Sequence, residues 1–71
     1  MRERRDPEPD AAFTAFFADQ HPRVVASLTL AFGDEQVARD AAADAFAEAL
    51  LRWDRVGAMA SPAGWVHRVA R

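Results

Sequence analysis

Three acidic residues at four-residue intervals are the first candidates for chemistry in this sequence. On a helix, Asp40, Asp44 and Glu48 would fall within roughly 80° of one another. Carboxylates in such a row could hold a cation, transfer protons or attract a basic partner. Asp40 and Asp44 have no basic residue one turn away, and like charges at this spacing repel by about 0.2–0.5 kcal/mol per pair. The row is therefore either a solvated helix face or a docking surface for a positively charged partner.

Patterns typical of catalysis or metal binding do not accompany the acidic row. Metal sites in helical bundles combine Glu with His on facing helices, and neither His21 nor His67 lies in a Glu-x-x-His motif. The chain has no cysteine, and no Ser-His-Asp set or glycine-rich phosphate loop stands out. We predict a protein that is not an enzyme and that needs no metal or cofactor.

The apolar pattern predicts that the acidic row lies on the longest helix of an all-α protein. This helix should run from about Glu35 to Trp53, and a pair between Glu35 and Arg39 should support it. The preceding Gly33 suits the end of one helix and Asp34 the N-cap of the next. The predicted apolar arc contains Ala38, Ala42, Ala45, Phe46, Ala49, Leu50 and Trp53.

Two shorter helices are predicted before the long helix. The first starts with Asp10 as N-cap and buries a stripe of phenylalanines on one face. The dipeptide His21-Pro22 interrupts the pattern, and Pro22 suits the first turn of a second helix that ends near Phe32. The residues expected on the two apolar faces are Phe13, Phe16 and Phe17, and then Val24, Val25, Leu28 and Phe32.

A last helix is predicted after a loop at residues 57–60. Ser61 suits its N-cap and Pro62 its first turn. One face should hold Trp65, Val66 and Val69, and the other His67, Arg68 and Arg71. We expect a small bundle of three to four helices at residues 10–71, preceded by a disordered N-terminal arm at residues 1–9, which is polar and contains two prolines.

The overall composition sets limits on the class of protein. The chain has 71 residues, nine arginines, eleven acids and a formal net charge of −2. This balance by itself points to neither nucleic acid nor membrane as partner, and no apolar run approaches the roughly 18 residues of a membrane helix. We therefore expect a soluble, cytoplasmic protein that does not bind membranes.

Four segments, in order, resemble region 2 of the sigma factors of bacterial RNA polymerase. They are FTAFFADQHPRVVASLTLAFGD (13–34), ARDAAADAF (38–46), AFAEALLRWDRV (45–56) and SPAGWVHRVAR (61–71). The resemblance covers nearly the whole chain. It is strongest to the extracytoplasmic-function group of the sigma-70 family.

The resemblance implies a function in transcription initiation. In that family, the helix matching residues 35–53 docks on the clamp coiled coil of the polymerase β′ subunit, which is basic. Asp40, Asp44 and Glu48 would therefore be polymerase-binding residues. The segment matching the last helix helps to bind and melt the promoter −10 element, so Arg68 and Arg71 would contact DNA, with His67 in place of an aromatic residue.

Several points remain open at the level of the sequence. The pattern stops at Arg71 without a helix-ending signal, so we expect a C-terminally incomplete region 2 whose own binding to promoter DNA is weak. An anti-sigma factor and a second copy of the chain are further candidate partners. The alternative function is a non-catalytic helical interaction module that self-associates or binds another protein.

Overall fold

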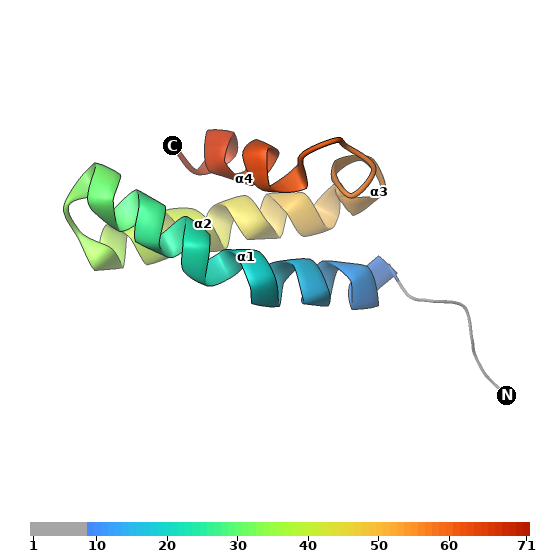
Figure 1. Ribbon diagram of the computed structural model, residues 1–71, viewed down its shortest axis with the longest axis horizontal. Helices are drawn as coiled ribbons and strands as arrows, with labels where there is room; N and C mark the ends of the chain where they lie inside the picture. Colours follow the sequence, from blue (N-terminus) through green and yellow to red (C-terminus); the bar gives the residue numbers. More distant parts are fainter. Residues whose placement is uncertain (1–8) are drawn as a thin grey trace, which may run out of the picture.

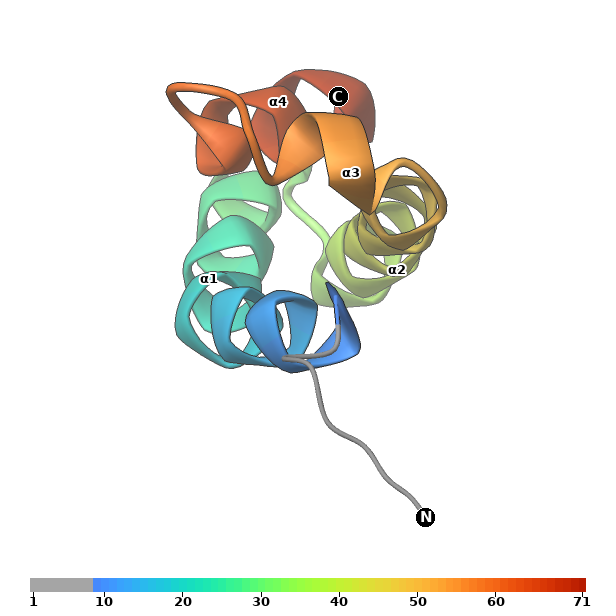
Figure 2. The ribbon, with the colours of Figure 1, turned by 90° about the vertical axis from the view of Figure 1, so that its right-hand side faces the viewer.

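Four helices pack into a small all-α bundle in the computed structural model, which describes residues 9–71. They are α1 (Pro9–Phe32), α2 (Glu35–Leu51), α3 (Trp53–Val56) and α4 (Pro62–Ala70). Helices α1 and α2 form an antiparallel hairpin, and α4 packs alongside it (Figure 1). In the end-on view, α1, α2 and the α3–α4 segment surround a common core (Figure 2). This confirms the predicted fold class; the predicted arm, apart from Pro9, lies outside the described residues.

The predicted break at His21-Pro22 is wrong, because α1 is one helix that contains Pro22. A proline inside a helix removes one backbone hydrogen bond and costs about 3 kcal/mol. Packing on both sides of Pro22 offsets this cost: Phe16 packs on the core before it, and Val24 and Leu28 are fully buried after it. The ribbon of α1 changes direction about midway (Figure 1). Asp10, predicted as N-cap, lies inside the helix because α1 begins at Pro9.

The junctions on either side of α2 follow local chemistry. Gly33 has a φ of 73°, a left-handed conformation that glycine adopts without steric cost. The Asp34 carboxylate accepts a hydrogen bond from the Val37 amide at 3.0 Å and caps α2 as predicted. At the other end, the helical path stops at Arg52, whose φ and ψ are −114° and 26°. Helix α2 therefore ends before Trp53, which instead begins the short α3.

The first turn of α4 also has the predicted cap, since the Ser61 hydroxyl accepts a hydrogen bond from the Gly64 amide at 3.0 Å. Four residues predicted on buried apolar faces are exposed instead. Phe17 is 37% and Phe32 40% exposed on α1, and Leu50 is 45% and Val69 44% exposed on α2 and α4. Leu50 and Val69 sit at the margin of the apolar arcs of α2 and α4, so the neighbouring helix does not reach them. The buried core consists of Val24, Val25, Leu28, Ala38, Ala42, Ala45, Phe46, Ala49, Val56, Val66 and Ala70.

Candidate protein-docking surface

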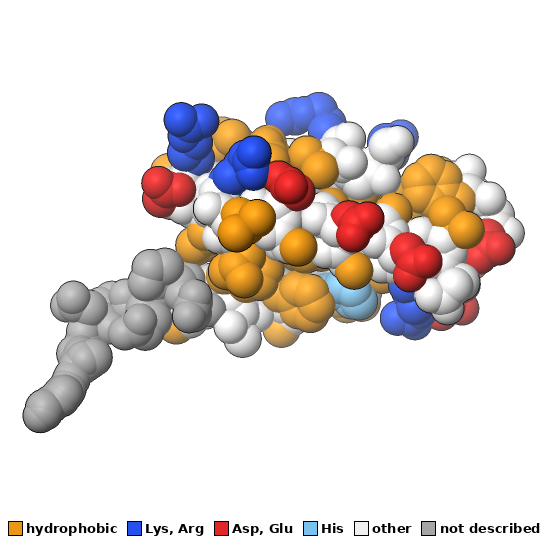
Figure 3. Space-filling view, turned by 180° about the vertical axis from the view of Figure 1, so that it is seen from behind, with side chains coloured by type: hydrophobic (Ala, Val, Ile, Leu, Met, Phe, Trp, Pro, Cys, Tyr) orange, Lys and Arg blue, Asp and Glu red, His pale blue; other side chains and the backbone are white. Residues whose placement is uncertain are grey.

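The outer face of α2 carries the three acidic residues predicted to act together. Asp40, Asp44 and Glu48 are all exposed, and they lie opposite the buried alanines that pack on α1 and α4. We call these three residues the acidic ridge. Acidic side chains follow one another across this face of the molecule, with apolar side chains beside them (Figure 3). The structure thus brings the predicted carboxylates together on one accessible surface.

Local hydrogen bonds engage the ridge only in part. The Gln36 amide nitrogen donates to the Asp40 carboxylate at 3.1 Å, which leaves the charge of Asp40 unneutralised. Within residues 9–71, no ion pair involves Asp40 or Asp44. Glu48 differs, because its carboxylate lies 2.6 Å from the Arg52 guanidinium. The ridge therefore presents two carboxylates without a local counter-ion and one that is paired.

Two exposed apolar side chains flank the ridge and were missed by the sequence reasoning. Val37 is 50% and Leu51 77% exposed. With 100° per residue, both fall within the arc of roughly 80° that the acids occupy. Their positions on the helix place them on the acidic face, but the sequence analysis predicted apolar residues only for the buried face. A row of carboxylates with an aliphatic group at each end is suited to a protein partner, which can cover apolar groups as well as pair charges.

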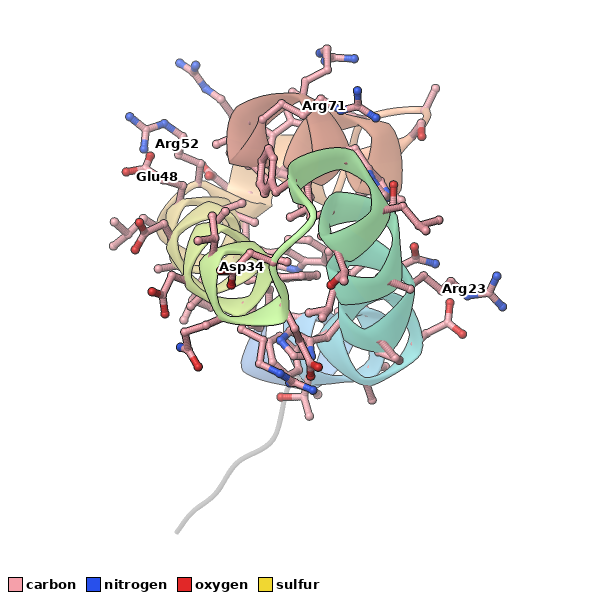
Figure 4. The ribbon with its side chains drawn as sticks, turned by 90° about the vertical axis from the view of Figure 1, so that its left-hand side faces the viewer. Arg23, Asp34, Glu48, Arg52 and Arg71 are labelled. Carbon is pink, nitrogen blue, oxygen red and sulfur yellow. The ribbon has the colours of Figure 1, made fainter. Side chains whose placement is uncertain are left out.

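The predicted DNA-contacting residues lie on α4 and its end. Arg68 and Arg71 are exposed and His67 is half-buried. Trp65 packs against the core, as its position on the apolar face predicted. Arg71 extends away from the α1–α2 hairpin (Figure 4). Arg68 and Arg71 are therefore both accessible, three residues apart at the end of α4, while His67 is only partly exposed.

Two further arginines precede α4 and were not predicted from the sequence to contact DNA. Arg52 and Arg55 are both exposed. With Arg68 and Arg71 they make up all the basic charge of residues 52–71, apart from His67, and Asp54 is the one acid there. Basic side chains lie along the edge that α3 and α4 form (Figure 3). We call Arg52, Arg55, Arg68 and Arg71 the arginine surface; its signal in the sequence is the change in charge after Leu51.

An open apolar groove of about 530 Å³ lies elsewhere on the molecule, between α1 and the start of α2. Leu30, 88% exposed, is at its edge, and the ion pair between Glu35 and Arg39 (2.8 Å) lines its α2 side. The sequence reasoning did not predict this groove, because it depends on how α1 runs past α2. Its lining residues are His21, Pro22, Val25, Ala26, Thr29, Leu30, Glu35 and Arg39.

The described residues, 9–71, contain neither a metal-binding cluster nor a membrane-spanning helix. Among these residues, no group of three or more His, Cys, Asp or Glu side chains could hold a metal ion. None of the four helices combines the length and apolarity needed to cross a membrane. Comparison of the chain with protein-family models, curated proteins and solved structures found no match.

Proposed function

We propose that this chain is region 2 of a sigma factor of the extracytoplasmic-function group, which binds core RNA polymerase in the bacterial cytoplasm. The proposal is supported by the four ordered segments that resemble this region. It is also supported by the all-α fold, in which these segments form α1, α2 with α3, and α4. The partner would be the basic clamp coiled coil of the polymerase β′ subunit.

The observation that carries the proposal is the outward-facing acidic ridge on α2. The like charges of Asp40 and Asp44 repel each other, and neither residue has a counter-ion within residues 9–71. A basic coiled coil would supply that counter-charge. Exposed ion pairs contribute only about 0.2–1 kcal/mol each, so the charges would serve mainly to orient the partner and speed its approach. Burial of Val37 and Leu51 would add affinity at about 25 cal/mol per Å² of apolar surface.

Promoter DNA is the second proposed partner, through His67, Arg68 and Arg71. An arginine guanidinium can make two parallel hydrogen bonds to a phosphate, and Arg68 and Arg71 are exposed for this role. Binding through two or three phosphate contacts is weak at physiological salt, because the release of counterions that drives it becomes less favourable as the salt concentration rises. The chain would therefore hold promoter DNA only weakly by itself and would act on the −10 element when bound to polymerase.

The test is retention of core RNA polymerase by the immobilised chain. The double variant Asp40→Arg with Asp44→Arg should lose retention, because it sets like charges against a basic clamp. Asp19→Arg is the matched control, since it reverses an exposed acid on α1 outside the ridge. Helicity by circular dichroism should be the same in all proteins. Full retention of polymerase by the double variant would refute the docking role of the ridge.

The groove between α1 and α2 favours a second candidate, a helical interaction module that binds another protein. A groove of this type can accept the apolar face of a partner helix, and Leu30 at its edge is almost fully exposed. Under this hypothesis, Leu30→Asp would abolish binding to the partner and the ridge variants would not. Immobilised Leu30→Asp, compared with the ridge variants, therefore separates the two functions.

A further inference from the structure

Arg52 lies where the arginine surface meets the acidic ridge. It follows the last residue of α2 and precedes the first residue of α3. Its guanidinium lies 2.6 Å from the Glu48 carboxylate at the end of the acidic ridge, and both side chains are about half exposed. Glu48 and Arg52 lie beside each other on the outer side of α2, and Arg71 lies on the α4 side of the same view (Figure 4). Arg52 is thus the member of the arginine surface that touches the ridge.

The charge of the chain changes sign at this ion pair. Residues 34–51 contain five acids and one arginine, and residues 52–71 contain four arginines and one acid. Among residues 11–71, whose side chains the structure describes, no ion pair involves Arg55, Arg68 or Arg71. Arg52 is therefore the one arginine of this surface whose charge is already engaged by a carboxylate in the described part of the chain.

We propose that the pair between Glu48 and Arg52 couples the acidic ridge to the arginine surface. When a cationic partner pairs with Glu48, Arg52 is released from this ion pair. Arg52 can then bind a phosphate of the same nucleic-acid strand that Arg55, Arg68 and Arg71 contact. This inference rests on the proposed function, because it assigns the cationic partner to the ridge. It adds Arg52 and Arg55 to the nucleic-acid contacts and makes one of them conditional on docking.

The coupling arises because the Glu48 carboxylate and a nucleic-acid phosphate compete for the same Arg52 guanidinium. A phosphate that binds Arg52 must first displace Glu48, and a partner that has already displaced it removes this cost. By linkage, nucleic acid bound at Arg52 strengthens partner binding at Glu48 by the same factor. For an exposed ion pair the factor is between about 1.4 and 5. Release of Arg52 also steepens the salt dependence of single-strand binding by about 0.7 in log–log slope.

Substitution of Glu48 isolates the coupling without any polymerase. The probe is a fluorescein-labelled single-stranded oligothymidylate, titrated with the full chain at low ionic strength and followed by fluorescence anisotropy. Glu48→Gln, which keeps the shape but removes the charge, should tighten binding about 1.4- to 5-fold and steepen the salt dependence. Asp44→Asn is the matched control: it removes one ridge charge without releasing an arginine and should tighten binding less.

A double-mutant cycle decides whether Arg52 carries the effect. In an Arg52→Gln background, Glu48→Gln should have no more effect than Asp44→Asn. The proposal is overturned if Glu48→Gln keeps its full effect in that background, if Glu48→Gln and Asp44→Asn act equally in the parent, or if the parent chain binds no oligonucleotide at low salt. None of these outcomes depends on polymerase, whose retention tests the docking role separately.

Discussion

Phe13 of α1 and Trp53 of α3 meet edge to face, with ring centroids 5.4 Å apart and an interplanar angle of 84°. Trp53 also lies 5.1 Å, centroid to centroid, from Phe16. These contacts join the N-terminal half of α1 to the segment that follows α2. The end of α2, where Glu48 and Arg52 lie, is therefore held in place by aromatic packing on its inner side.

Phe46 is the centre of this aromatic group and should be the most sensitive position for stability. Its ring lies within 4.9–6.5 Å of the rings of Phe13, Phe16, Phe17 and His21. Phe46→Ala should lower the free energy of unfolding by about 3–5 kcal/mol. A chain of this length has about 4–11 kcal/mol in total, so the variant should lose a large part of its stability and unfold at a much lower urea concentration than the parent.

The exposed Leu51 on the same helix is the control for Phe46. Leu51→Ala removes a similar type of side chain from a position that is 77% exposed, and it should change the free energy of unfolding by no more than about 0.5 kcal/mol. Equal losses for the two variants would contradict the described core.

Gly33 should resist replacement because of its backbone, not for lack of space. Its φ is 73°, and a Cβ at this position would meet no atom within 4 Å. Gly33→Ala should cost about 1–2 kcal/mol through the left-handed conformation alone. Gly33→Asn should cost less, since asparagine visits this region more readily. Thermal unfolding of both variants measures the difference, and a tolerated alanine would mean that α1 and α2 join by another turn.

The Ser61 cap should stabilise the start of α4. Ser61→Ala removes the acceptor of the Gly64 amide and should cost about 1 kcal/mol, which corresponds to a fall in melting temperature of about 4–8 °C for a domain of this size. Ser61→Asp retains an acceptor and should behave like the parent. If alanine and aspartate at this position melt together, the cap contributes nothing.

Pro22→Ala distinguishes the single helix α1 from the two helices that the sequence predicted. In a continuous helix, alanine restores the backbone donor and removes the clash with the preceding turn, so the free energy of unfolding should rise by about 1 kcal/mol or more. At the first turn of a separate helix, loss of the rigid proline would instead lower stability. Urea denaturation measures whether Pro22→Ala raises or lowers the free energy of unfolding.

The agreement between sequence and structure depends on whether local chemistry decides the feature. The caps at Asp34 and Ser61 were predictable because the side chain bonds its own helix. The exposed face of α2 was predictable from helical period alone. The continuity of α1 through Pro22 was not, since burial of residues far along the chain overrides a local helix breaker. The exposure of Leu50 and Val69 depends likewise on where neighbouring helices lie.

Site-specific photo-cross-linking tests the proposed docking most directly. A benzophenone amino acid replaces Ala47, which is exposed among the ridge residues, or Ala18, which is exposed on α1. The chain is then irradiated with core RNA polymerase, and the linked peptides are identified by mass spectrometry. We predict cross-links from position 47 to the β′ clamp coiled coil and none from position 18. Cross-links to polymerase from position 18, with position 47 unlinked, would contradict the proposal.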